Sequence, residues 1–189
     1  MKTFFLAKRS TTALLAIAAL TFAASTLPRA SHAQSASVPR QLAGTWVLHG
    51  DAESAMRTVD AAFWPTVSTL PEIMHGMARD RIRANMTPPR RVLVTLDGSR
   101  VRVRLEAART SVIAGPVGSP ATTSGVEPGT VVTPRLQAGW LELLYEGEGS
   151  SLRQLFSTEP DGSRMHVDYT VTGPMLRGQV RYRLDYVHP

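Results

Sequence analysis

The polar side chains best suited to chemistry lie in two short segments. His166 and Asp168 alternate in one of them, an arrangement that suits an acid–base pair or part of a metal site. Val167 and Tyr169 alternate with them and would occupy the opposite face of a strand. We therefore interpret His166 and Asp168 as outward-facing residues of a β-sheet, with catalysis or metal binding as the alternative.

The second segment holds His49, Asp51 and Glu53, whose side chains can ligate metals but whose spacing matches no recognised metal motif. Carboxylates at the start of a helix interact favourably with its free backbone N–H groups. This role explains Asp51 and Glu53 without a metal. The sequence predicts neither a bound metal nor a cofactor.

Nucleophilic catalysis finds no support in the sequence. The chain has no cysteine, which excludes thiol catalysis, disulfide bonds and zinc held by cysteine. The Gly-x-Ser-x-Gly pattern of serine hydrolases is absent, and the segment Gly147–Ser151 is typical of a hairpin turn. We therefore predict a protein that is not an enzyme.

The charge of the chain is concentrated near its start. The full sequence carries 21 Lys and Arg against 15 Asp and Glu, a net charge of +6. Four of the basic residues lie within residues 1–33, so the remainder has 21 − 4 = 17 basic and 15 acidic residues, a net charge of +2. A balance so close to neutral excludes nucleic acid as the expected partner.

Residues 1–33 have the pattern of an export signal. Lys2, Lys8 and Arg9 precede an apolar run from Leu14 to Ala24, and Ser31-His32-Ala33 provides small residues at the cleavage positions. The run is shorter than the roughly 20 residues of a membrane-spanning helix, which argues against the alternative of an uncleaved anchor. We expect cleavage after Ala33 and a periplasmic or secreted protein whose single domain is residues 34–189, without stable insertion of that domain in a membrane.

A helical pair is predicted at about residues 51–86, after a first strand over 42–48. Asp51 caps the first helix, whose apolar residues recur at helical spacing up to Phe63, and Pro65 ends it. Thr69 and Glu72 form a capping box for the second helix, which ends near Asn85. The second helix is expected to pack through one apolar face, formed by Leu70, Ile73, Met74, Met77, Ala78 and Ile82.

From residue 90 the apolar pattern alternates with period two, as in half-buried strands. Val101, Val103 and Leu105 share one face of the clearest strand, and Asp97-Gly98 forms a tight turn before it. Glycine and proline interrupt residues 109–136. The expected strands are 91–96, 100–106, 110–114, 118–123, 130–136, 140–145, 152–156, 164–172 and 179–187.

These elements predict a mainly β fold. An up-and-down antiparallel barrel of 8–10 strands buries one face of every strand, and the helix–turn–helix between the first and second strands caps it. A barrel of this size is either filled by side chains or holds one small ligand.

The start of the first strand resembles known barrels. Gly44-Thr45-Trp46 is similar to the Gly-x-Trp motif that opens lipocalins, and the order of strand, two helices and about nine strands resembles fatty-acid-binding proteins. Both families are calycins. This resemblance, whose sequence-specific part is three residues, implies a calycin-like barrel with an inward Trp46.

One feature of the fatty-acid-binding proteins is missing. They typically hold a carboxylate with an inward Arg-x-Tyr pair on the last strand, and no such pair occurs in this last strand. If Tyr182 faces inward, Arg181 and Arg183 face outward. The same alternation predicts that the last hairpin pairs residues whose numbers sum to 351, with His166 opposite Asp185 and Asp168 opposite Arg183.

The leading functional hypothesis is a non-enzymatic binding protein for a small apolar or amphipathic, lipid-like ligand in the barrel cavity. The alternative is a structural or protein-interaction barrel of the cell envelope with a filled interior. Met74 and Met77 would form a pliable lid or simply pack on the barrel, and Arg79, Arg83, Arg90 and Arg91 could form a rim that contacts anionic lipid. The candidate ligand-binding residues are Trp46, Met74, Met77, Val101, Val103, Leu143, Tyr145, Gln154, Phe156, Tyr169 and Tyr182.

Overall fold

The computed structural model describes residues 40–176 and 178–189, so the predicted signal peptide and its cleavage after Ala33 lie outside the described residues. A short 3-10 turn, Arg40–Leu42, precedes the first strand. The elements that follow are β1 (Gly44–Leu48), α1 (Ala52–Val67), a 3-10 turn (Glu72–Met74), α2 (His75–Asn85), β2 (Arg91–Asp97), β3 (Arg100–Glu106), β4 (Thr110–Pro116), β5 (Thr122–Ser124), β6 (Val131–Gln137), β7 (Trp140–Gly147), β8 (Ser150–Thr158), β9 (Arg164–Thr172) and β10 (Val180–Val187). Among the described residues, no helix is long and apolar enough to cross a membrane.

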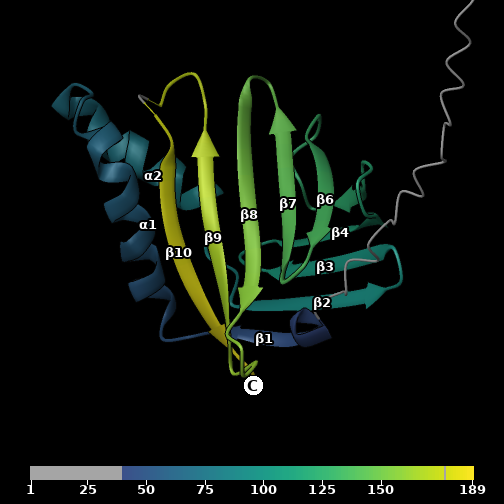
Figure 1. Ribbon diagram of the computed structural model, residues 1–189. Coiled ribbons are helices and arrows are strands. Elements are labelled where there is room, and N and C mark those ends of the chain that lie inside the picture. The colour runs from purple at the N-terminus through teal and green to yellow at the C-terminus, as the bar shows by residue number, and fades with distance from the viewer. Residues whose placement is uncertain (1–39, 177) are drawn as a thin grey trace, which may run out of the picture. The chain divides into compact units, whose positions relative to one another are not determined.

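The ten strands form one antiparallel sheet in the order β5-β4-β3-β2-β1-β10-β9-β8-β7-β6. The strands β2–β4 run across β7–β10, so the sheet curls back on itself (Figure 1). Two backbone hydrogen bonds join its ends: Gly118 N–H donates to the carbonyl of Pro134 at 2.7 Å, and Ala121 N–H to that of Val132 at 2.8 Å. The result is a nearly closed barrel with two helices between β1 and β2, which confirms the predicted fold class.

Alternation of side chains decides which face of each strand lies inside. In β3, Val101, Val103 and Leu105 are buried, whereas Arg100, Arg102 and Arg104 are exposed. The turn at Asp97-Gly98 forms as predicted, and Gly98 has the positive φ that such a turn requires.

The last hairpin has the predicted register. Val180 pairs with Val171 and Tyr186 with Met165, and all residue pairs of β9 and β10 sum to 351. A shift by one residue would move the apolar face into water, so burial specifies this register. The inner face carries Tyr169 and Tyr182, and the outer face carries the charged residues.

The strands between residues 109 and 136 differ from the prediction. The expected strand at 118–123 is instead a loop followed by the three-residue β5, while β4 extends to Pro116 and β6 starts at Val131. Gly118 adopts a positive φ, and its N–H bonds to β6 rather than continuing a neighbouring ladder. This geometry explains why a strand does not form there.

Helix α1 begins as predicted, with the Asp51 carboxylate accepting a hydrogen bond from Ser54 N–H at 2.7 Å. Its buried residues Ala55, Val59, Phe63 and Val67 recur every four positions and pack toward β10. The prediction that Pro65 ends the helix is wrong, because α1 continues to Val67. A proline so near the end of a helix removes a single backbone hydrogen bond, and the next residues keep helical geometry.

Helix α2 differs more strongly from the prediction. The Thr69 hydroxyl donates to the carbonyl of Thr66 at 2.8 Å and does not cap α2, which starts after a 3-10 turn. The expected packing of the whole apolar face is also wrong: no residue of α2 is buried, and Ile73 is 91% exposed. Met77 is 70% exposed, and only Ile82 and Met86 reach the core from this part of the chain.

Candidate ligand-binding site

The inner face of the barrel is apolar and carries no charged side chain among the described residues. Every strand from β6 to β10 contributes buried residues to one continuous core, to which α1 adds Val59 and Phe63. Of the arginines whose side chains are described, all but Arg164 are exposed, and Arg164 pairs with Asp185 on the outer face. An apolar, uncharged interior can receive an apolar molecule without leaving a buried charge unpaired.

All four tyrosines of the chain point into this interior. The rings of Tyr169 and Tyr182 stack with 4.6 Å between their centroids, and Phe63 of α1 lies 6.4 Å from Tyr182. The Tyr186 hydroxyl donates to the carbonyl of Pro89 at 3.1 Å. Burial raises the pKa of Tyr145, Tyr182 and Tyr186, and burial together with the neighbouring Tyr186 hydroxyl raises the pKa of Tyr169. The four hydroxyls are therefore neutral hydrogen-bonding groups at physiological pH.

Gln154 is the one inward-facing amide of the described barrel and is buried. Leu143 pairs with Gln154 and Tyr145 with Leu152 across β7 and β8, so Gln154 shares the inner face with the buried Leu143. The Tyr145 hydroxyl donates to Oε1 of Gln154 at 3.2 Å. Gln154 also pairs across the strands with Tyr169, so the amide lies beside the stacked tyrosines.

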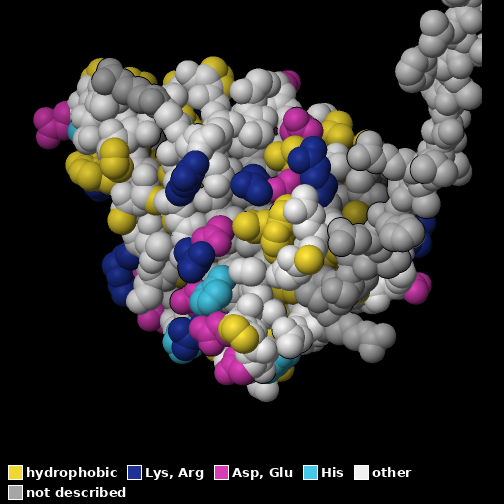
Figure 2. All heavy atoms as spheres, in the orientation of Figure 1, with side chains coloured by type: hydrophobic (Ala, Val, Ile, Leu, Met, Phe, Trp, Pro, Cys, Tyr) yellow, Lys and Arg dark blue, Asp and Glu magenta, His cyan; other side chains and the backbone are white. Residues whose placement is uncertain are grey.

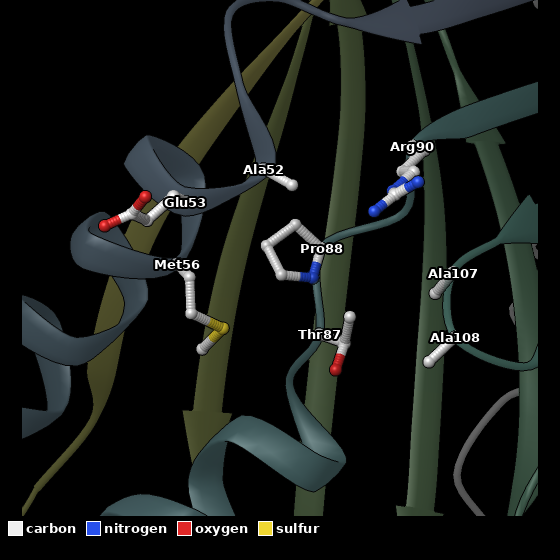
Figure 3. A pocket seen from close by; sticks show the side chains of 8 residues that line it. All are labelled: Ala52, Glu53, Met56, Thr87, Pro88, Arg90, Ala107 and Ala108. Carbon is white, nitrogen blue, oxygen red and sulfur yellow. The ribbon is translucent and has the colours of Figure 1, made fainter.

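A hollow of about 560 Å³ opens beside the start of α1. Its walls come from three segments, α1, the residues that lead into β2, and the turn between β3 and β4 (Figure 3). Met56 points from α1 toward the hollow, and Glu53 points away from it (Figure 3). The lining residues are Ala52, Glu53, Met56, Thr87, Pro88, Arg90, Ala107 and Ala108.

A chain of contacts links the wall of the hollow to the interior. Met86 directly precedes Thr87 in that wall, and the Tyr182 hydroxyl lies 4.0 Å from the Met86 sulfur. Tyr182 stacks on Tyr169, which pairs with Gln154. Met86 packs against the core, so its flexible thioether contacts the stacked tyrosines from the segment that follows α2.

The candidate residues from the sequence fall into two groups. Nine of the eleven line the barrel interior, eight of them buried and Tyr145 half-buried. Met74 and Met77 instead lie on the exposed side of the helical cap, because the apolar face of α2 is not covered by the described residues. The interior group is Trp46, Val101, Val103, Leu143, Tyr145, Gln154, Phe156, Tyr169 and Tyr182.

The sequence did not single out the residues that connect the cap to the barrel. Met86 and Phe63 contact Tyr182 from the helical segment, and neither was assigned to the site. The helical spacing that ends at Phe63 was a usable signal, since it places Phe63 on the buried face of α1. The walls of the hollow come from segments distant in sequence, and no local pattern marks them.

The charged side chains of β9 and β10 lie on the outer face, where several of them pair with one another. Asp168 accepts two hydrogen bonds from Arg183, at 2.7 and 2.8 Å, and His166 Nδ1 lies 2.7 Å from Asp185. Basic and acidic side chains alternate over the face formed by β7–β10 (Figure 2). Nowhere in residues 40–176 and 178–189 do three His, Asp or Glu residues gather to hold a metal.

Glu142 is an outer-face residue that is nevertheless buried, with 4% of its side chain exposed. It is held between two arginines of the neighbouring strands, Arg135 at 3.3 Å and Arg153 in closer contact. The two arginines provide the positive charge that a buried carboxylate needs, and they remain half-exposed to water themselves.

The chain matches no model of a known protein family and no curated protein sequence. A mutant of the REP1-NXSQ fatty acid transporter is structurally similar at a TM-score of 0.51 and 15% identity, over 79% of this chain and 99% of that chain. The wild-type fluorescent protein UnaG is similar at a TM-score of 0.50 and 12% identity, over 79% and 98%. The chain shares the barrel fold of these two proteins. This result confirms the fold implied by Gly44-x-Trp46 and by the order of the elements.

Proposed function

We propose that the protein is an exported, non-enzymatic carrier that binds a small apolar or amphipathic molecule inside its calycin barrel. The observation that carries the proposal is the uncharged, apolar inner face of the barrel. Binding sites for small molecules are concave and mostly apolar, with a few polar groups that fix orientation. Gln154 and the tyrosine hydroxyls are such groups.

Export fits the segment that precedes the barrel, with its basic start, short apolar run and small residues before position 34. The similarity to a fatty acid transporter supports a binding role at the level of fold. Fold alone does not assign a ligand, so the ligand class has to come from the chemistry of the interior.

A second function is favoured by a different observation. The inner-face side chains are packed closely, with Trp46, Leu143 and Phe156 fully buried, and four apolar side chains of the cap lie exposed: Trp64, Ile73, Met74 and Met77. A filled barrel that uses this exposed face to contact a protein or an anionic lipid surface would have both features. The guanidinium of Arg79, 4.6 Å from the Trp64 ring centroid, places a positive charge at the same face.

A binding assay separates the two functions. We expect the chain from residue 34 onward to take up the neutral probe Nile red with saturable fluorescence, and we expect native mass spectrometry of protein from its own host to show a bound small molecule. The variant Met86→Trp should reduce uptake by placing a bulky ring against Tyr182, whereas Met77→Trp, on the exposed cap, should leave uptake unchanged. If Nile red binding is lost with Met77→Trp and kept with Met86→Trp, the probe binds on the cap and the barrel carrier is wrong.

A further inference from the structure

The charge of the barrel interior identifies the class of ligand. The described strands place no arginine, lysine or histidine on the inner face, and the last strand presents Arg181 and Arg183 to solvent. His188, which stacks on Trp46, follows β10 and is exposed. A carboxylate placed inside would lose its hydration and gain no cation in exchange. The interior therefore disfavours the anionic form of an amphipathic molecule.

The polar groups that do face inward are neutral and can both donate and accept hydrogen bonds. Gln154 accepts a hydrogen bond from Tyr145 through Oε1, which leaves its amide Nε2 as a donor. Among the described residues, Nε2 has no hydrogen-bond partner, and no fully enclosed polar side-chain atom lacks one. The Nε2 atom must therefore lie beside space that a water-sized molecule can enter. A ligand oxygen in that space would give the amide the partner that it lacks.

The tyrosines around Gln154 strengthen this donor set. Tyr169 pairs with Gln154 across the strands, and Tyr182 stacks on Tyr169. Burial keeps the pKa of both phenols above the ordinary value, so they remain protonated donors at any physiological pH. The same low polarity that raises the pKa of the phenols would oppose a negatively charged ligand group.

We infer that the barrel selects an uncharged amphipathic ligand, such as a long-chain alcohol, ester or amide, whose polar group is held by Gln154 next to Tyr145 and Tyr169. This inference rests on the proposed carrier function. The rival arrangement puts an anionic head group at the hollow, beside the exposed Arg90.

Displacement of Nile red by two probes of equal chain length, dodecan-1-ol and dodecanoate, tests the inference on the unmodified protein. At pH 8 we expect the alcohol to displace Nile red at a concentration about tenfold or more below that of the ionised acid. The difference should shrink as the pH is lowered to about 5, where part of the acid is protonated. Equal or tighter binding of the acid at pH 8 would overturn the inference, and its loss in Arg90→Gln would then place the head group at the hollow.

Variants locate the polar group. Gln154→Leu should weaken dodecan-1-ol about tenfold, and more than it weakens Nile red. The matched control Gln137→Leu makes the same change at an exposed position of β6 and should alter neither. If Gln154→Leu folds and binds the alcohol unchanged, the head-group assignment is wrong. Failure of Nile red and both amphiphiles to bind the unmodified protein would instead reject the carrier function itself.

Discussion

The imidazole ring of His188 stacks on the indole ring of Trp46, with 3.9 Å between the ring centroids. Trp46 is fully buried, and its Nε1–H donates to the carbonyl of Leu42 at 3.1 Å. Nδ1 of His188 lies 3.2 Å from the carbonyl of Thr45. These contacts fasten the start of β1 to the residues that follow β10, so the two ends of the barrel sequence stabilise each other.

Replacing Trp46 by alanine should therefore be costly. We expect Trp46→Ala to lower the free energy of unfolding by about 3–5 kcal/mol, through lost apolar burial and the cavity left behind. Urea denaturation followed by circular dichroism measures the change. Trp64→Ala is the matched control, since Trp64 is exposed on the cap, and it should cost less than about 1 kcal/mol. A loss below about 1 kcal/mol for Trp46→Ala would contradict the packing described.

The tyrosines predict a loss of stability at alkaline pH. Burial raises their pKa in the folded protein above the ordinary value of 10.0, while the unfolded chain ionises near that value. The contribution of the tyrosines to the free energy of unfolding is complete below about pH 9. It falls once the pH exceeds their pKa in the unfolded chain, by at most about 1.4 kcal/mol per pH unit for each tyrosine. Tyrosinate absorbance should appear only together with unfolding, and Tyr182→Phe should reduce the slope of stability against pH. Ionisation of all four tyrosines near pH 10 in the folded protein would show that they are not buried.

The Asp168–Arg183 pair predicts a small coupling. Both side chains are partly exposed, so solvent screens the interaction despite two short hydrogen bonds. A double-mutant cycle with Asp168→Ala and Arg183→Ala should give about 0.2–1 kcal/mol, decreasing with added salt. A coupling above about 2 kcal/mol would point to a role for this pair beyond the register of the hairpin.

Glu142 predicts an asymmetry between partners. Removing Arg153 leaves a buried carboxylate with only Arg135, so Arg153→Met should cost about 1–3 kcal/mol in thermal or urea unfolding. Glu142→Gln should cost less, because the two arginines are half-exposed and can be hydrated. Arg102→Met, at an exposed position of β3, serves as the control. If Glu142→Gln proves the more damaging substitution, the carboxylate has a role other than this pairing.

The barrel strands could be predicted because alternation is a strong constraint. In β9 and β10, eight apolar residues had to meet on one face, and only one register does this while pairing Asp168 with Arg183. The same alternation puts Gln154, a candidate ligand-binding residue from the sequence, on the inner face. The strands around β5 were predicted poorly, because glycine and proline there remove the alternation on which the argument depends.

The helical cap shows the limit of periodicity. Spacing indicates that Ile73 and Met77 share a face of the chain, but it does not say what covers that face, and in the structure the described residues leave it exposed. The capping box failed for a local reason: the Thr69 hydroxyl meets the carbonyl of Thr66 at the end of α1 before it can reach α2. The hollow could not be predicted from the sequence, because its walls come from three segments that only the tertiary fold brings together.

The seam between the two ends of the sheet has a further consequence. The carbonyls of Val132 and Pro134 on the free edge of β6 already accept hydrogen bonds from Ala121 and Gly118. Proline has no N–H, so this edge also lacks a donor at residue 134. A strand from a second molecule would find these two acceptors occupied and one donor missing. The seam thus protects this edge from the edge-to-edge aggregation to which open β-sheets are prone.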